Sequence, residues 1–341
     1  MLVKTILVTG GTGYIGSHAV IQLLAAGYQV VILDNLANSK ASVVQRIQQI
    51  SAKPVKFVQG DIRDKALLAK IFQQQQIFAV FHFAGLKAVA EAEQEPQLYY
   101  DNNVLGSLNL FSTMREYQVN HLIFSSSATV YGMTSAKQYD ETMPLQPCNV
   151  YGRTKYFIEQ ILQDICASDP AFKVAILRYF NPAGAHISGL IGEDPMGLPN
   201  NLMPYLAKVA SGDLPHLNIY GNDYPTPDGT GKRDYIHVED LVRGHLLSLD
   251  YLVREQNNIT VNLGTGRAYS VLELLQAFEK ACQRTIPYQF VARRSGDLAE
   301  YYANPNLALQ QLNWQPQFDV ERMCVDMWRW QTFSQANNTK Q

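Results

Sequence analysis

Short apolar runs alternate with longer amphipathic stretches over the first 180 residues. The apolar runs are rich in β-branched residues and have the length of strands: Thr5 to Thr9, Gln29 to Leu33, Val55 to Val58, Phe78 to Phe83, His121 to Ser125 and Phe172 to Tyr179. The stretches between them are predicted helices: Tyr14 to Ala26, Ser39 to Ser51, Lys65 to Gln75, Gln97 to Tyr117 and Val150 to Ala167. This alternation is typical of βαβ units, because parallel strands need long crossover connections. We therefore expect an α/β protein with a doubly wound parallel sheet.

The pattern changes after Asn181, where proline, glycine and asparagine interrupt regular structure. The sequence predicts a loop-rich half with helices near Asn201 to Ser211, Val238 to Leu252 and Ser270 to Cys282, and an amphipathic run from Val320 to Phe333. We expect two domains, residues 1–180 and 181–341. Within the second, residues 236–265 contain a helix and a strand-like run that could return to the first sheet.

Composition narrows the possible partners. Lys plus Arg number 28 against 30 Asp plus Glu, which gives a net charge of −2. Nucleic acids and anionic membranes select a basic surplus, so neither is an expected partner. No apolar run approaches the roughly 18 residues of a membrane span, and the N-terminus leads directly into a strand. We expect a cytoplasmic protein.

The cysteines and histidines do not form a metal-binding pattern. Cys148, Cys166, Cys282 and Cys324 are far apart in the sequence, with no Cys-x-x-Cys pair. The seven histidines are also dispersed. We expect reduced thiols and no metal.

Three glycines lie between the first strand and the first helix. Gly10, Gly13 and Gly16 stand at a spacing of three in the segment that also holds Tyr14 and Ile15. Such glycines permit a tight turn, a close approach of backbone to a pyrophosphate, and packing of helix on strand. The turn therefore predicts a dinucleotide site at the helix N-terminus.

Two aspartates follow the next strands. Asp34 ends the second strand, where a carboxylate accepts a hydrogen bond from a ribose 2′-hydroxyl and repels a 2′-phosphate. NAD is thus favoured over NADP. Asp61 ends the third strand and is either an adenine contact or a helix N-cap, although Asp64 is better placed to be the cap.

Tyr151 and Lys155 are one turn apart at the start of a predicted helix, so their side chains share a face. A neighbouring cation and a positive nicotinamide ring favour a phenolate, which makes Tyr151 a candidate proton acceptor. Ser127 and Thr129 follow a strand on the ligand side of the sheet, where hydroxyls could bind a reacting oxygen.

These motifs together resemble the extended short-chain dehydrogenase/reductase superfamily. Within it, further segments resemble the UDP-glucose 4-epimerase family: residues 83–89, 125–132, 178–182, 199–204 and 229–237. The resemblance runs from about residue 5 to 330. It implies a Rossmann-like sheet with a smaller C-terminal α/β lobe that binds substrate.

The resemblance also implies a reaction, the reversible epimerisation of UDP-glucose and UDP-galactose at C4. Tyr151 takes the proton of the sugar 4-hydroxyl while hydride passes to bound NAD. A 4-ketose forms, rotates and takes the hydride back on its other face. Ser127 and Thr129 bind the sugar, Lys155 holds the nicotinamide ribose and lowers the pKa of Tyr151, and no step needs a metal.

The remaining site residues follow from the same resemblance. Around NAD it implies Asn35, Asn38, Asp61, Ile62, Phe83, Ala84, Lys87, Asn102, Tyr179 and Pro182 beside the glycine turn, Asp34, Tyr151 and Lys155. Around the nucleotide sugar it implies Asn181, Asn201, Leu202, Tyr220, Arg233, Arg294, Asp297 and Tyr301. Two arginines suit a pyrophosphate, because a guanidinium binds phosphate oxygens bidentately.

Two finer expectations concern substrate and assembly. Tyr301 is bulky where the family places the sugar C2 substituent, so we expect poor turnover of N-acetylated UDP-hexoses. The helices at 97–117 and 150–167 carry a second apolar stripe, which is either intramolecular core or a homodimer contact. The resemblance favours the homodimer.

Three other functions remain open to different degrees. A nucleotide-sugar 4,6-dehydratase needs an additional acid and base, and Ser127 is followed by Ala128 and Thr129 without a carboxylate. A dehydrogenase that releases NADH shares the Tyr, Lys and Ser set. A non-catalytic dinucleotide sensor would not need both Tyr151 and Lys155.

Overall fold

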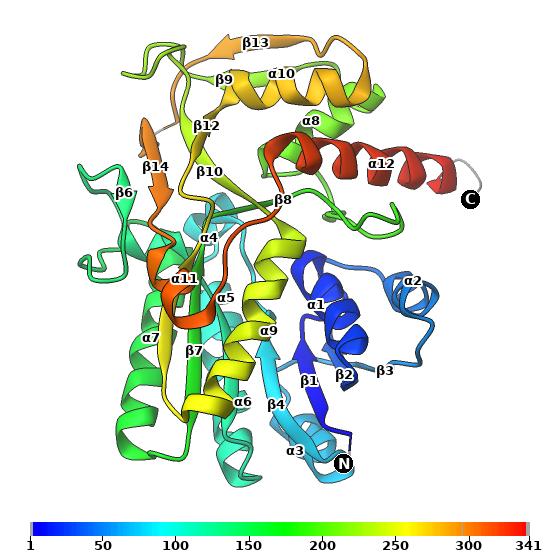
Figure 1. The fold of residues 1–341 in the computed structure, drawn as a ribbon, viewed down its shortest axis with the longest axis vertical. Coiled ribbons are helices and arrows are strands. Elements are labelled where there is room, and N and C mark those ends of the chain that lie inside the picture. The colour runs from blue at the N-terminus through cyan, green and yellow to red at the C-terminus, as the bar shows by residue number, and fades with distance from the viewer. Residues whose placement is uncertain (1–2, 295, 339–341) are drawn as a thin grey trace.

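The computed structural model describes residues 3–294 and 296–338, and its larger sheet confirms the α/β fold class (Figure 1). Seven parallel strands lie in the order β11-β7-β5-β4-β1-β2-β3. Their bounds are β1 Thr5–Thr9, β2 Gln29–Asp34, β3 Lys56–Gln59, β4 Ile77–His82, β5 His121–Ser127, β7 Lys173–Tyr179 and β11 Ile259–Leu263. The strand order reverses between β1 and β4, which is where open α/β sheets bind ligands.

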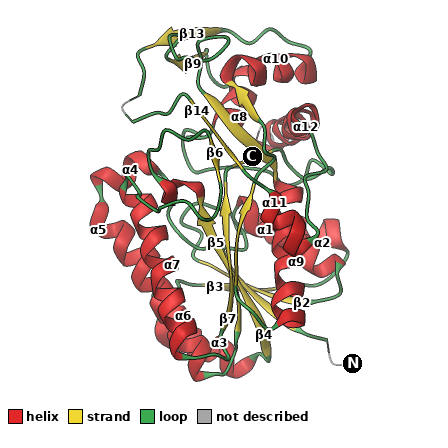
Figure 2. Ribbon diagram, turned by 60° about the vertical axis from the view of Figure 1, so that its left-hand side comes forward, coloured by secondary structure: helices red, strands yellow, loops and turns green. Residues whose placement is uncertain are grey.

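Helices cover both faces of this sheet (Figure 2). On one face lie α1 (Tyr14–Ala25), α2 (Ser42–Ser51) and α9 (Val238–Glu255); on the other lie α3 (Lys65–Gln74), α6 (Gly106–Glu116) and α7 (Val150–Ser168). The strands sort their side chains by alternation, since Ile6 and Val8 pack with α1 and α9 whereas Leu7 packs with α3, α6 and α7. Burial on both faces explains why these strands read as continuous apolar runs.

Residues 238–263 return from the second half of the chain to the large sheet. β11 pairs in parallel with β7, with Leu263 opposite Tyr179. Helix α9 packs against α1, and α11 (Asn306–Leu312) packs against α9 and β11. The buried Trp314 fixes this arrangement, because its Nε1 donates to the carbonyl of Asp240 at 2.9 Å.

The rest of the second half, joined by β6 from the first half, forms a smaller α/β lobe beyond the carboxyl ends of the large sheet (Figure 1). Its main sheet has the order β12-β10-β14-β6 with β8 paired to β10, and β9 pairs with β13. These strands are β6 Gln138–Tyr139, β8 Asn181–Ala183, β9 Leu217–Tyr220, β10 Lys232–His237, β12 Ala268–Ser270, β13 Tyr288–Val291 and β14 Glu300–Ala303. The lobe's helices are α8 Leu202–Ser211, α10 Val271–Cys282 and α12 Val320–Asn338. The sequence predicted these helices within a few residues and missed the strands.

The helix expected over Gln97 to Tyr117 is broken into three parts. It consists of α5 (Pro96–Tyr99), a π-helix (Tyr100–Leu105) and α6, and it follows the short α4 (Val89–Gln94). A further single turn, a 3₁₀ helix over Ala128–Tyr131, follows β5. Single π-turns inside helices frequently occur at functional sites, and this one carries Asn102.

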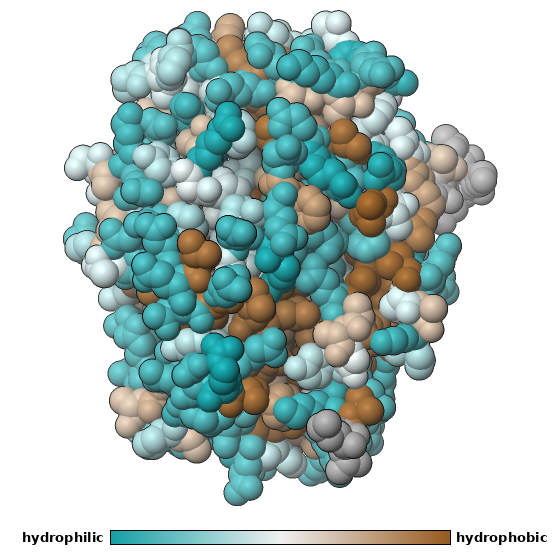
Figure 3. Space-filling model, viewed as in Figure 1, coloured by the Kyte–Doolittle hydropathy of each residue, from teal (hydrophilic) through white to brown (hydrophobic). Residues whose placement is uncertain are grey.

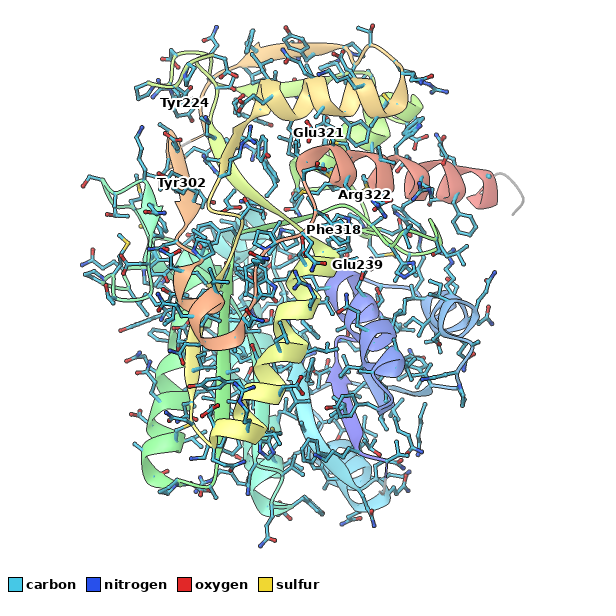
Figure 4. All side chains as sticks on the ribbon, viewed as in Figure 1. Tyr224, Glu239, Tyr302, Phe318, Glu321 and Arg322 are labelled. Carbon is cyan, nitrogen blue, oxygen red and sulfur yellow. The ribbon has the colours of Figure 1, made fainter. Side chains whose placement is uncertain are left out.

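The two lobes meet where α9 and α12 begin, at the level of Glu239, Phe318 and Arg322 (Figure 4). Gln22 of α1 donates to the Glu239 carboxylate at 2.6 Å. The His237 ring lies 4.7 Å from the Phe318 ring, and the Arg322 guanidinium covers the same Phe318 ring at 5.3 Å. The first contact joins α1 to the start of α9, and the other two join the end of β10 to the start of α12.

The surface in Figure 3 is mixed, with small hydrophobic areas separated by hydrophilic residues.

Among the helices of the described residues, none combines the length and apolar character needed to cross a membrane. Within residues 3–294 and 296–338, no three His, Cys, Asp or Glu side chains are grouped so that they could hold a metal ion. The four cysteines are free thiols.

Candidate functional site

The glycine turn leaves the N-terminus of α1 open. Gly10 has φ +71°, and a Cβ there would lie 2.7 Å from the Ala84 nitrogen; a Cβ on Gly16 would lie 2.1 Å from the Gly10 carbonyl oxygen. Both positions therefore require glycine. Gly13 is the N-cap residue of α1, and no side chain accepts a hydrogen bond from the first turn of this helix. The N–H groups of Tyr14 and Ile15 therefore face the sheet edge. Such an end favours an anion.

Asp34 organises the loop after β2. It is buried, and its carboxylate accepts hydrogen bonds from the Thr12 N–H at 3.1 Å, the Leu36 N–H at 2.9 Å and the Ser39 hydroxyl at 3.2 Å. A carboxylate has about four acceptor positions, so one remains for a ligand hydroxyl. The loop is thus fixed by the residue expected to bind the ribose.

Asp61 lies beside this loop, where it accepts from the Asn35 side chain at 2.9 Å. A hydrogen bond from Arg63 lowers the pKa of Asp61 to about 2, so Asp61 is a carboxylate at neutral pH. It is not a helix cap: Asp64 caps α3 by accepting from the Leu67 N–H at 2.9 Å. The structure therefore excludes the cap role among the two that the sequence left open, and the adenine contact stays a prediction.

The loop after β4 closes over the glycine turn. The N–H groups of Phe83 and Ala84 donate to the Thr9 carbonyl at 3.0 and 3.1 Å. Asn103 in the π-helix holds the next residues, since it accepts from the Leu86 N–H at 2.8 Å and donates to the Leu86 carbonyl at 3.0 Å. Asn102 donates to Asn103 at 2.9 Å. Asn103, which the sequence analysis did not single out, is thus the residue that orders this loop.

Tyr151 and Lys155 lie together at the start of α7, as their spacing predicted. The N-cap Asn149 accepts from the Gly152 N–H at 2.7 Å and sets where the helix begins. The Lys155 ammonium is buried, donates to the Ser125 carbonyl at 2.8 Å and lies 5.9 Å from the centre of the Tyr151 ring. The end of β5 and the first turns of α7 therefore bring phenol and ammonium to the same point.

The two hydroxyls after β5 complete this group. The Thr129 hydroxyl donates to Ser127 at 3.0 Å, and the Ser127 side chain is hydrogen-bonded to Tyr151. A reacting oxygen beside Tyr151 would thus meet a chain of hydroxyl groups that can pass or hold a proton.

Burial sets the charge state of both groups in the chain itself. It raises the pKa of Tyr151 to about 12, against the opposing effect of the hydrogen bond with Ser127. It lowers the pKa of Lys155 to about 8, against the opposing charge of Glu159. Lys155 alone therefore does not produce a phenolate, and the second positive charge named from the sequence, that of a nicotinamide ring, is needed as well.

Glu159 does not neutralise Lys155, because it is committed elsewhere. Its buried carboxylate pairs with Arg178 at 2.6 Å and accepts from the Ser126 hydroxyl. Arg178 in turn donates to the Tyr131 hydroxyl at 3.1 Å. This buried network joins β5 and α7 to β7 and the 3₁₀ turn. The sequence offered no sign of it, because its members lie on four separate elements.

Arg233 and Tyr301 form a second group in the smaller lobe, opposite each other on β10 and β14. Arg233 donates to Asp297 at 2.9 Å and to the Leu298 carbonyl at 2.8 Å, and its guanidinium covers the Tyr301 ring at 4.7 Å. Tyr301 also stacks on Tyr139, with 5.5 Å between ring centres. The tyrosine is therefore held in a fixed position.

The other residues expected at the nucleotide sugar lie on neighbouring elements. Arg294 covers the Tyr220 ring at 3.8 Å, beside the paired strands β9 and β13. Asn181 donates to the Asp234 carbonyl at 2.8 Å and so joins β8 to β10. Asn201, the N-cap of α8 directly before Leu202, donates to Glu193 at 2.7 Å. Glu193 was not identified from the sequence.

Four of the expected cofactor residues make contacts within the fold. Tyr179 ends β7 and shares a hydrogen bond with the Ser125 hydroxyl, and Pro182 lies in β8 directly after it. Ile62 is buried, and a Cβ on Gly106 would meet its Cδ1 at 2.6 Å. Asn38 accepts from the Met196 N–H at 2.9 Å.

Known proteins resemble this chain in both sequence and structure. Residues 6–264 match the NAD dependent epimerase/dehydratase family. UDP-glucose 4-epimerase of Neisseria meningitidis serogroup A is 53% identical over 328 residues, which are 96% of this chain and 97% of that protein.

Solved structures agree over nearly the whole chain. The crystal structure of the UDP-glucose 4-epimerase from Stenotrophomonas maltophila, with bound NAD and formylated UDP-arabinopyranose, has a TM-score of 0.96 at 49% identity and covers 98% of this chain and 99% of that one. The enzyme from Bifidobacterium longum in complex with NAD+ and UDP has a TM-score of 0.93 at 47% identity, with 97% and 99% covered.

The buried ammonium predicts a pH-dependent stability. Below pH 8 the folded chain carries a buried charge at Lys155, whereas between pH 8 and 10.5 the unfolded chain binds the additional proton, so stability rises with pH. Lys155→Met removes this cost. The Tm advantage of Lys155→Met over the unaltered chain is expected to be largest below pH 8 and to shrink towards pH 10.5. Calorimetry across this range measures it, and a Tm difference independent of pH would contradict the assignment.

Proposed function

Because the chain belongs to the NAD-dependent epimerase/dehydratase family, we propose that it interconverts UDP-glucose and UDP-galactose by inverting C4. The observation that carries the proposal is the placement of Tyr151, Lys155 and Ser127 at one point of the sheet edge, with Arg233 and Tyr301 in the lobe beyond it. One group suits proton transfer and the other suits a nucleotide diphosphate.

The glycine turn and its surroundings fit NAD. The space at Gly10 and Gly16 that no Cβ could enter admits a pyrophosphate beside the open end of α1. Asp34 and Asp61 would hold the adenosine, and Lys155 and Tyr179 would face the nicotinamide half. NAD bound there would add a positive charge near Tyr151 and would supply the hydride acceptor and donor for C4 of the sugar.

The chain's own residues supply the proton chemistry. With a positive charge near it, the Tyr151 phenol loses the penalty that burial imposes on its anion and can accept the proton of the sugar 4-hydroxyl. Ser127 and Thr129 bind the same oxygen and keep it within reach. The same contacts would return the proton to the 4-oxygen once C4 has taken its hydride back on the opposite face, so the reaction has no net oxidation.

The smaller lobe binds the nucleotide sugar. Arg233 and Arg294 each lie on an aromatic ring, which restrains the planar guanidinium groups that would bind a pyrophosphate. Asn181, Asn201 and Leu202 would contact the sugar and uridine from the strand and helix that follow β7. This half holds the substrate while C4 is presented to Tyr151.

We also propose a homodimer and a cytoplasmic location. The outer faces of α5, the π-helix, α6 and α7 expose apolar side chains, namely Leu98, Leu105, Leu108 and Phe157. The Tyr100 ring stacks on Phe157 with 6.0 Å between centres, which joins these helices into one surface. Two such surfaces would form a four-helix contact across a two-fold axis. The free thiols suit a reducing compartment.

Turnover of UDP-galactose without added NAD tests the proposed reaction. Conversion to UDP-glucose with no accumulation of free NADH is expected. Tyr151→Phe is expected to lower kcat by about 10²- to 10⁴-fold while NAD stays bound, because the proton acceptor is lost. Tyr117→Phe, the same change at a distant helix end that contacts Gln73, is the control. Normal turnover by Tyr151→Phe, or net production of NADH, would refute the proposal.

The fixed Tyr301 ring predicts discrimination against a large C2 substituent. UDP-galactose is expected to be turned over much faster than UDP-N-acetylgalactosamine, and Tyr301→Ala to raise the relative rate on the N-acetyl substrate by about tenfold or more. Tyr302→Ala is the matched control, since successive side chains of a strand alternate and Tyr302 directly follows Tyr301 in β14. Equal rates on both substrates in the unaltered chain would contradict the role of Tyr301.

Sedimentation tests the homodimer. Phe157→Glu places a charge at the centre of the proposed contact and is expected to shift the protein to monomers, because a desolvated unpaired charge opposes association. Leu309→Glu, at an exposed apolar position on α11, is expected to leave the mass unchanged. A monomeric unaltered protein, or a dimer that survives Phe157→Glu, would argue against this surface.

A further inference from the structure

Glu193 is a buried carboxylate that two donors from different lobes share. It lies between β8 and α8, and its side chain is only 4% exposed. Its Oε1 accepts from the Lys87 ammonium at 2.8 Å and from the Asn201 amide at 2.7 Å. Lys87 follows β4 in the large lobe, whereas Asn201 caps α8 in the smaller lobe.

The backbone around Glu193 is held in place by α12. The Trp330 ring nitrogen donates to the Glu193 carbonyl at 3.2 Å. The preceding Gly192 packs on the same ring, where a Cβ would lie 2.4 Å from a ring carbon. In Figure 1 this green stretch of chain passes between α12 and the side of the sheet that carries α1 and α2. The backbone that carries the Glu193 carboxylate is therefore held in place independently of Lys87 and Asn201.

The same stretch contacts the loop that Asp34 organises. Asp194 pairs with Lys40 at 2.7 Å, and the Met196 N–H donates to Asn38 at 2.9 Å. Residues 193–196 thus touch the loops after both β2 and β4, and these are the loops that carry the expected cofactor residues. Burial, and after it the charge of Glu193 and Glu239, raises the pKa of Tyr14 in the glycine turn, which places the carboxylate near that turn as well.

We propose that Glu193 is a positioning residue that couples binding of the nucleotide sugar to retention of the cofactor. The inference rests on the proposed function, because that function assigns Lys87 to NAD and Asn201 to the UDP-sugar. A ligand that orders Asn201 also orders Glu193, and through it Lys87. By linkage, each ligand then raises the affinity of the chain for the other.

The energetics favour coupling over two independent contacts. A buried carboxylate that loses a partner remains as an uncompensated charge, which is strongly unfavourable. The second oxygen of Glu193, Oε2, is buried and has no hydrogen-bond partner among the described residues. The two donors on Oε1 are therefore the hydrogen bonds that stabilise the charge of this carboxylate in the described structure. Lys87 is half exposed and its long side chain has other positions available, which makes its order dependent on Glu193.

Exchange of bound NAD against labelled NAD, with and without saturating UDP, tests the coupling without requiring turnover. In the unaltered holoenzyme UDP is expected to slow the exchange by about tenfold. Glu193→Gln is expected to reduce this UDP effect to less than about twofold, because the amide no longer holds the Lys87 ammonium. The readout is a ratio, so a general loss of NAD affinity does not produce it.

Lys87→Met removes the same ion pair from its exposed side and keeps the test valid if Glu193→Gln folds poorly. It is expected to lose the UDP effect equally, and the double variant is expected to be no worse than either single one. Asp194→Asn, which removes only the exposed pair with Lys40, is the control and is expected to keep the full effect.

Exchange that UDP does not slow in the unaltered enzyme, or a UDP effect that persists in both Glu193→Gln and Lys87→Met, would overturn the coupling. Neither result would affect the proposed epimerase, whose own failure is read from UDP-galactose turnover.

Discussion

The buried ammonium of Lys155 is the constraint around which the site is built. Burial disfavours its charge, and the nearest carboxylate, Glu159, is committed to Arg178 and Ser126. One backbone carbonyl, that of Ser125, holds it in place. The protein therefore accepts a local cost at this position, as functional sites commonly do. The uncompensated charge is then free to act on whatever anion forms beside it, and Tyr151 is the phenol within reach.

The smaller lobe supplies the side chains that would select the substrate for this charged site. Parallel strands bring β5, β4 and β1 to one edge, so the glycine turn, the hydroxyls and the ammonium meet there whatever else the chain contains. The short strands β8, β10 and β14 then carry Asn181, Arg233 and Tyr301 over that edge. Glu193 joins the two halves at the point where their ligands would meet. Chemistry and recognition thus lie on separate lobes with a defined connection.

Local patterns predicted the first 180 residues well, because a strand buried on both faces and an amphipathic helix each have a clear periodicity. Spacing alone also paired Tyr151 with Lys155 and identified the glycine turn. The strands of the smaller lobe were missed because they are short and polar, as Lys232 to Asp234 in β10 shows. Asn103 and Glu193 were missed because their roles depend on tertiary contacts: Glu193 meets Lys87 across 106 residues. The raised pKa of Tyr151 in the chain without cofactor was not foreseen, because proximity to Lys155 is visible in the sequence and burial is not.

Ionisation of Tyr151 is the most direct test of this account. The chain has 19 tyrosines, so the ultraviolet difference between the unaltered protein and Tyr151→Phe isolates the one signal during a pH titration. Without cofactor the pKa is expected near 12. With NAD bound it is expected to fall by at least about two pH units, because the charge of NAD then adds to that of Lys155, and Lys155→Met is expected to make that fall smaller. An active holoenzyme in which the pKa of Tyr151 stays near 12 would contradict the central claim.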